Sequence, residues 1–148
     1  MFIAISLHIL AATIWVGGMF FAYGFLRPVA ADVLEPAKRL TVWVQVFAKF
    51  FNWVWLAIIL LIATGHYMVA QFGGLANVGM HVHVMMLLGY IMMGVFMHVY
   101  FAPFKRLKAA VSLQDWPTGA SNLNTIRKLV LLNLTLGLLT VFIGSAGR

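Results

Sequence analysis

Four long apolar stretches dominate this sequence, and each can cross the hydrocarbon core of a membrane as a helix, which takes about 20 residues. Charged residues make up only 9% of the 148 residues. Soluble domains contain roughly 25% charged residues, so this composition excludes that class. The sequence therefore predicts an all-α, integral membrane four-helix bundle. We expect one transmembrane domain over residues 1–148, with spans at about 2–26, 46–70, 78–103 and 125–145.

Basic residues predict the orientation of the bundle. The connections after the first and third spans are rich in them, with Arg27, Lys38, Arg39, Lys105, Arg106 and Lys108. The connection at 71–77 has none. Short loops rich in Lys and Arg stay in the cytoplasm, so both termini are expected outside it (N-out/C-out), in a bacterial inner membrane with the termini on the periplasmic side.

The formal net charge of +7 comes from these two connections and from the helix ends beside them, apart from Arg148 at the C-terminus. The bilayer is therefore the expected partner, and no nucleic acid is. Cysteine is absent, which excludes disulfides, thiolate metal sites and cysteine nucleophiles. We expect segments 27–35 and 104–123 to be loops, with a turn at Asp115-Trp116-Pro117. Pro36 is expected in the first turn of the second helix, because its missing N–H is unpaired there anyway.

Histidines are the only titratable groups expected deep in the spans. Ion-coupled transporters usually carry an ionisable residue within the membrane, and here no Asp, Glu, Lys or Arg lies there. His8, His66, His81 and His83 come from three spans and fall in one outer layer about 10 Å thick, at 1.5 Å per residue. His98 lies near the inner surface.

These four outer histidines are the candidate metal ligands. Imidazole in lipid is costly unless it ligates a metal or finds a hydrogen-bond partner, and neutral imidazole binds haem iron, copper and zinc. His81 and His83 point about 200° apart on a helix, so only one can face the bundle centre. Tyr90 shares the face of His83 and favours His83 as the inward residue. The alternative is that each histidine is interfacial, half hydrated and incidental.

Three further features suggest a cofactor pocket. Trp15 lies seven residues beyond His8, and Gly17-Gly18 after it would let a helix or a flat macrocycle approach closely. Asn133 is a buried amide that either lines a cofactor pocket or links two helices by a hydrogen bond.

Methionine supplies a competing signal. The run from Met80 to Met86 mixes imidazole and thioether groups, both acceptable to Cu(I), and Met68 is expected nearby on the neighbouring helix. Methionine is also ordinary apolar filler in membrane helices.

Several short motifs resemble known families. Leu7-His8, Trp15, Gly17-Gly18 and Arg27-Pro28 resemble the first span of the copper-resistance protein D (CopD-like) family and of the HemJ-type protoporphyrinogen oxidases. His81-Val82-His83 with Tyr90 resembles the third span of the HemJ type, and Arg127 followed by Asn133 fits the last span of both.

The resemblance implies a four-helix superfamily whose members bind haem b or are linked to copper handling, with His8 associated with haem. The HemJ type has a lysine where this chain has His83, which argues against protoporphyrinogen oxidation.

The leading prediction is a small membrane b-type cytochrome that transfers electrons. Haem b would lie near the outer leaflet, held by His8 and by His83 or His66, and the protein could act as a haem-dependent oxidoreductase. The redox partner is a quinone or an outward-side acceptor, and nothing in the sequence chooses between them. The alternatives are a copper-binding or copper-transport protein of the CopD type, using His66, His81, His83 and methionines, and a non-catalytic membrane subunit. A homo-oligomer is compatible with each.

Overall fold

The computed structural model describes residues 1–147, which are helical almost throughout. The elements in chain order are α1 (Phe2–Phe21), the π-helical η1 (Ala22–Leu26), α2 (Arg27–Val33), α3 (Pro36–Gln71), the short 3-10 turn η2 (Leu75–Asn77), α4 (Met80–Phe101), α5 (Pro103–Ser112) and α6 (Trp116–Ala146). The first three form one rod of 32 residues, and α4 with α5 forms one of 33 residues. With α3 and α6 they give four helices long and apolar enough to cross a membrane, which confirms the all-α membrane bundle.

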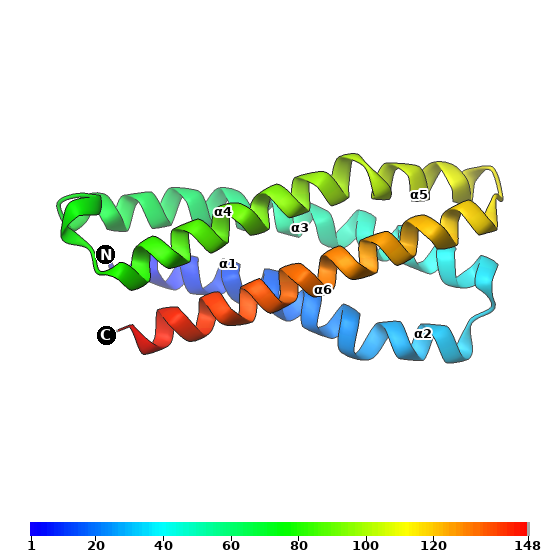
Figure 1. Ribbon diagram of the computed structural model, residues 1–148, viewed down its shortest axis with the longest axis horizontal. Coiled ribbons are helices and arrows are strands. Elements are labelled where there is room, and N and C mark those ends of the chain that lie inside the picture. The colour runs from blue at the N-terminus through cyan, green and yellow to red at the C-terminus, as the bar shows by residue number, and fades with distance from the viewer. Residues whose placement is uncertain (148) are drawn as a thin grey trace.

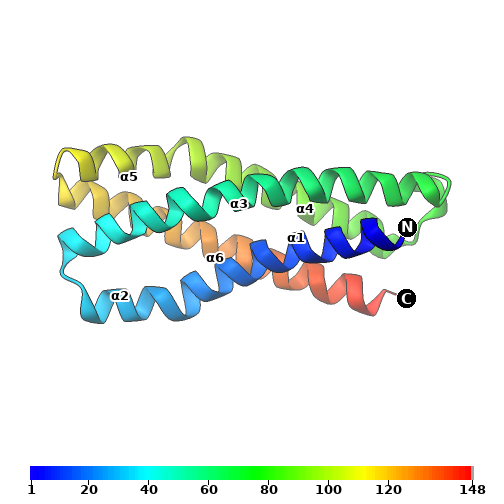
Figure 2. The same cartoon turned by 180° about the vertical axis from the view of Figure 1, so that it is seen from behind.

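The four rods run lengthwise beside one another, and the two ends of the bundle differ. Both termini and η2 lie at one end, whereas the tip of α2, α5 and the start of α6 lie at the other (Figures 1 and 2). α1 packs chiefly along α3, and α4 and α5 pack along α6. We call the end with the termini the outer end and the opposite one the inner end.

The two segments expected to be loops are largely helical, so that prediction is wrong. After the first span the only connection is Leu34 and Glu35, and α3 begins at Pro36 as predicted. After the third span, α5 buries Phe104, Leu107 and Ala110 on one face. Apolar residues at this spacing form a helical stripe, and the basic residues between them lie exposed on the opposite face.

The fourth helix begins earlier than expected, because Asp115 caps it. The Asp115 carboxylate accepts a hydrogen bond from the Thr118 backbone N–H at 3.3 Å. Asp is a preferred N-cap, and Pro117 suits the first turn that follows. The Asp115-Trp116-Pro117 motif is therefore a helix start rather than a turn between helices.

Pro28 explains the π-helical turn in the first rod. Proline has no N–H to donate, and its ring would clash with the carbonyl four residues earlier. The Arg27 N–H instead bonds the Ala22 carbonyl, five residues earlier, so the helix widens without breaking.

Aromatic side chains fill the core. The rings of Phe47 and Phe51 on α3 stack at 5.1 Å, and Phe104 packs edge-on against Phe51 with its centroid at 4.9 Å. Large apolar side chains also point outward, among them Phe2 at 81% exposure and Phe142 at 68%. Such an outer surface is suited to lipid rather than to water, as expected of helices in a bilayer.

Candidate functional site

His8 lies half-buried between α1 and α3 at the outer end. Its Nδ1 is 2.8 Å from the Thr64 hydroxyl oxygen, and that hydroxyl donates its single hydrogen to the Leu60 carbonyl at 2.6 Å. Thr64 can therefore only accept from His8, which places the imidazole proton on Nδ1. The lone pair of Nε2 remains available, as in metal-binding histidines whose other nitrogen donates to the protein.

His66 and Tyr90 join α3 to α4. His66 Nδ1 donates to the Ile62 carbonyl at 2.8 Å, so its Nε2 accepts from the Tyr90 hydroxyl, also at 2.8 Å. Both side chains are exposed on the surface of the bundle. The nitrogen of His66 that would ligate a metal is thus already hydrogen-bonded.

His83 lies on the outward face of α4, so the prediction that it points inward is wrong. It is exposed, and its Nδ1 donates to the Gly79 carbonyl at 3.2 Å, which leaves Nε2 free. His81 is the half-buried member of the pair, and its ring fills the space beside Gly147 after α6. Tyr90 does share the face of His83, but that face is exposed, because the buried stripe of α4 runs through Met92, Met93, Phe96 and Val99.

Trp15 and Asn133 lie deeper in the bundle than His8. Trp15 is 3% exposed and packs edge-on against Phe96 at 6.2 Å. The Asn133 amide donates to the Met92 carbonyl at 3.0 Å and so links α6 to α4, while its buried Oδ1 has no partner. Both residues line a cavity of about 20 Å³, far too small for a macrocycle. Their role in holding a cofactor stays a prediction, and the helix-linking role of Asn133 is confirmed.

The Gly17-Gly18 pair serves helix packing. The ring of Phe50 on α3 fills the space beside Gly18, whereas nothing lies within 4 Å of a side chain added at Gly17. Gly18 therefore lets α3 approach α1, as small residues do at membrane helix interfaces.

The outer histidines share one end of the bundle without converging. Within residues 1–147, no three His, Asp or Glu side chains are grouped closely enough to hold a metal ion. α1 packs against α3 and α6 and makes little contact with α4. His8 lies at the contact between α1 and α3, whereas His83 is exposed on α4, and the choice of ligands among the four outer histidines stays a prediction.

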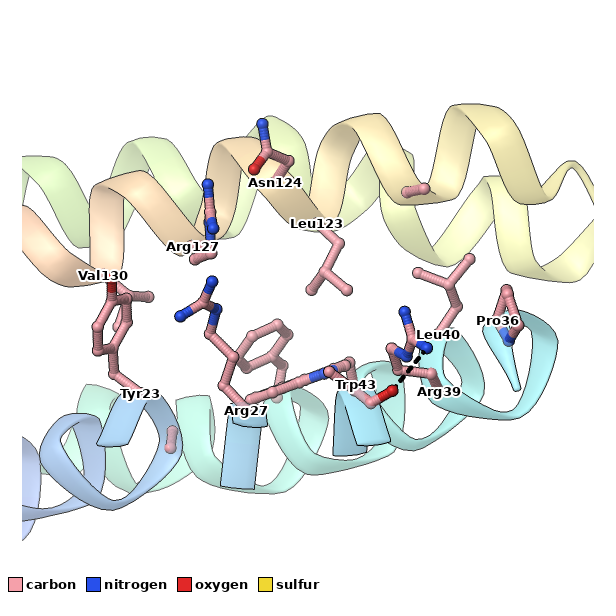
Figure 3. Close-up of a pocket in the computed structure, with 14 residues that line it drawn as sticks. Tyr23, Arg27, Pro36, Arg39, Leu40, Trp43, Leu123, Asn124, Arg127 and Val130 are labelled. Carbon is pink, nitrogen blue, oxygen red and sulfur yellow. Dashed lines mark hydrogen bonds between the residues drawn. The ribbon is translucent and has the colours of Figure 1, made fainter. Parts of the chain in front are cut away.

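A larger cavity, of about 270 Å³, lies toward the inner end between η1, α2, α3 and α6 (Figure 3). Three arginines line it: Arg27, Arg39 and Arg127. In the sequence these arginines indicated the orientation of the bundle and matched family motifs, but they predicted no cavity. The sequence did contain one indication of the cavity. Each arginine lies three or four residues from an apolar or aromatic residue that lines the same cavity, such as Tyr23, four residues before Arg27.

Comparison with known proteins identifies the family. The model of the family described as copper resistance protein D matches residues 44–146, more than two thirds of the chain. The match includes the histidines of α3 and α4 and begins after α1, which carries His8. No curated protein and no solved structure matches the chain. This four-helix membrane protein belongs to the copper resistance protein D family.

Proposed function

We propose that this protein binds Cu(I) at the outer end of the α1–α3 interface, with His8 as a ligand, and handles copper within the membrane. The observation that carries the proposal is the hydrogen-bond arrangement of His8 and Thr64. Thr64 holds the proton on Nδ1 and so leaves the Nε2 lone pair available in a half-buried position. Membership of the copper resistance protein D family supports copper as the metal.

A thioether is available beside His8. Met68 lies one helical turn beyond Thr64 on α3, toward the outer end, and is half-buried. Helical side chains lean toward the N-terminus of their own helix, and α1 and α3 run in opposite directions. The side chains of His8 and Met68 are therefore expected to lean toward one another, and imidazole with thioether is a ligand set that favours Cu(I).

The charge of the site also favours a monovalent ion. The acidic residues Asp32, Glu35 and Asp115 all lie at the inner end, and the chain has no cysteine. A divalent cation at His8 would therefore meet only neutral ligands in a medium of low dielectric constant, where an uncompensated charge is costly. Cu(I) carries half that charge.

A Cu(I) titration tests the proposal. The detergent-purified protein competes with a colorimetric Cu(I) chelator, and we expect one Cu(I) per chain. His8→Ala should abolish this binding. His98→Ala, which removes an exposed histidine from the inner half of α4, should not. Equal affinities in the wild type and His8→Ala would overturn the proposal.

Haem b held by His8 and His83, with electron transfer to a quinone or an outward-side acceptor, is the second candidate function. It is favoured by the free Nε2 atoms of both residues. The weak contact between α1 and α4 argues against it, because one haem needs both nitrogens on opposite sides of a single iron, and His83 is exposed on α4. An absorption spectrum before and after dithionite distinguishes the candidates. A Soret band with an α-band that sharpens on reduction would establish haem, whereas a colourless protein expressed with ample haem would exclude it.

A further inference from the structure

We propose that the arginine-lined cavity at the inner end binds the phosphate head group of an anionic phospholipid. The cavity of about 270 Å³ lies between η1, α2, α3 and α6, well away from the outer histidines. Its occupant is inferred from three properties: the charge of its lining, the partners of the arginines and the shape of its walls.

The cavity concentrates the arginines that are least accessible to water. Arg27, Arg39 and Arg127 are half-buried, whereas every other lysine and arginine among residues 1–147 is exposed. All three half-buried arginines line the cavity, and no Asp or Glu does. Arginine does not lose its proton in proteins, so the three guanidinium groups bring three positive charges to one space.

The arginines find neutral partners within the protein. Arg39 Nη2 donates to the carbonyls of Ala31 and Leu34, both at 3.0 Å, but its buried Nε has no partner. Arg27 lies over the ring of Tyr23, with 5.0 Å from the guanidinium carbon to the ring centroid. Neither contact neutralises charge, and like charges near a low-dielectric core repel strongly. An anion in the cavity would relieve that repulsion and accept the free N–H groups.

The walls fit an amphiphile rather than a free ion. Leu40, Trp43, Phe47 and Leu123 provide apolar and aromatic surface, and Figure 3 shows Leu123 pointing into the space between α3 and α6. α2 diverges from α6 beside the cavity (Figures 1 and 2), and we expect the acyl chains of the lipid to leave the head-group site between these two helices.

The charge balance favours a head group with two phosphates. Arginine pairs with phosphate through two parallel hydrogen bonds, and one phosphodiester would neutralise only one of three cations. Basic pockets between membrane helices on the cytoplasmic side are known to bind lipids of this type. We therefore expect diphosphatidylglycerol to bind more tightly than phosphatidylglycerol, and phosphatidylcholine to bind least.

Native mass spectrometry of the detergent-purified chain tests the site, with these three lipids and inorganic phosphate as separate ligands. Arg27→Gln and Arg127→Gln should each weaken diphosphatidylglycerol binding roughly tenfold, as expected for loss of a charge-assisted hydrogen bond. Lys128→Gln is the matched control, because it removes the same charge next to Arg127 from an exposed position that does not line the cavity.

Each other outcome counts against the proposal. An equal loss in Lys128→Gln would mean that general surface charge attracts the lipid. If phosphatidylcholine bound as tightly as diphosphatidylglycerol, the charge of the arginines would not select the lipid. Inorganic phosphate competing with the lipid at the same arginines would assign the site to a soluble anion. Circular dichroism and the Cu(I) titration at the outer end check that the variants are folded, and they separate this proposal from the copper proposal.

Discussion

Thr64 determines which nitrogen of His8 carries the proton, and so which nitrogen offers a lone pair to the proposed Cu(I). Its hydroxyl donates to Leu60 and accepts from His8 Nδ1, so the Nε2 lone pair depends on a single oxygen. In Thr64→Val the side chain keeps its shape and loses that acceptor. The imidazole must then leave a buried N–H unpaired or move its proton to Nε2, which would block ligation.

We expect Thr64→Val to lower the free energy of unfolding by about 1–2 kcal/mol, which thermal denaturation in detergent would measure. Cu(I) affinity should fall about tenfold, as it does when partners of metal-binding histidines are removed. Thr64→Ser should retain both properties. Thr135→Val is the control, since Thr135 also donates to a carbonyl four residues earlier but is exposed and contacts no histidine. Wild-type Cu(I) affinity in Thr64→Val would show that Thr64 does not select the tautomer.

At the scale of single helices, the length of the apolar stretches predicted the four spans but not their ends. The charged residues of α2 and α5 suggested loops, yet a charged residue is compatible with a helix whose other face is apolar. Phe104, Leu107 and Ala110 supply that face in α5. The sequence alone does not say whether such a stripe meets a partner helix, so helix ends near the membrane surface were harder to predict than the spans.

The contact between α1 and α3 provides a prediction at the same scale. A methyl group added at Gly18 would overlap the ring of Phe50, which packs against the core, whereas one added at Gly17 would meet open space. Gly18→Ala should therefore destabilise the bundle by about 1–3 kcal/mol through overpacking. Gly17→Ala should be neutral or slightly stabilising, because alanine favours helix more than glycine does.

Thermal unfolding of the two variants in the same detergent measures this difference. The two residues are adjacent and the substitutions identical, so the comparison isolates the contact with Phe50. A Gly17→Ala variant as unstable as Gly18→Ala would mean that backbone effects in α1, and not the approach of α3, dominate. The Cu(I) titration of Gly18→Ala adds a second readout, because a shift of α1 against α3 would also displace His8 from Thr64.

For the whole molecule, the sequence placed four histidines correctly at one end but could not show whether they meet. Their depth follows from residue number, at 1.5 Å per residue. The direction in which each imidazole points depends on the rotation of its helix about its own axis, and helix packing determines that rotation. His83 and Tyr90 share a face as predicted, but that face of α4 is exposed and does not point to the centre of the bundle. The arginine cavity was missed for a related reason, since its lining comes from elements distant in sequence.

The orientation of the bundle is the last prediction, and it decides which compartment each site faces. Basic residues crowd the end that carries α2 and α5, and short basic segments stay in the cytoplasm, so the termini and the outer histidines should face outward.

The chain lacks cysteine, which allows a direct test of this orientation with single cysteines. Leu75→Cys in η2 and Leu113→Cys between α5 and α6 both replace exposed residues, 49% and 80% accessible. A membrane-impermeant maleimide should label Leu75→Cys in intact cells and Leu113→Cys only after the membrane is opened. The reverse pattern would place His8 on the cytoplasmic side, so that Cu(I) would reach it from within the cell, and would turn the arginine cavity toward the outer leaflet.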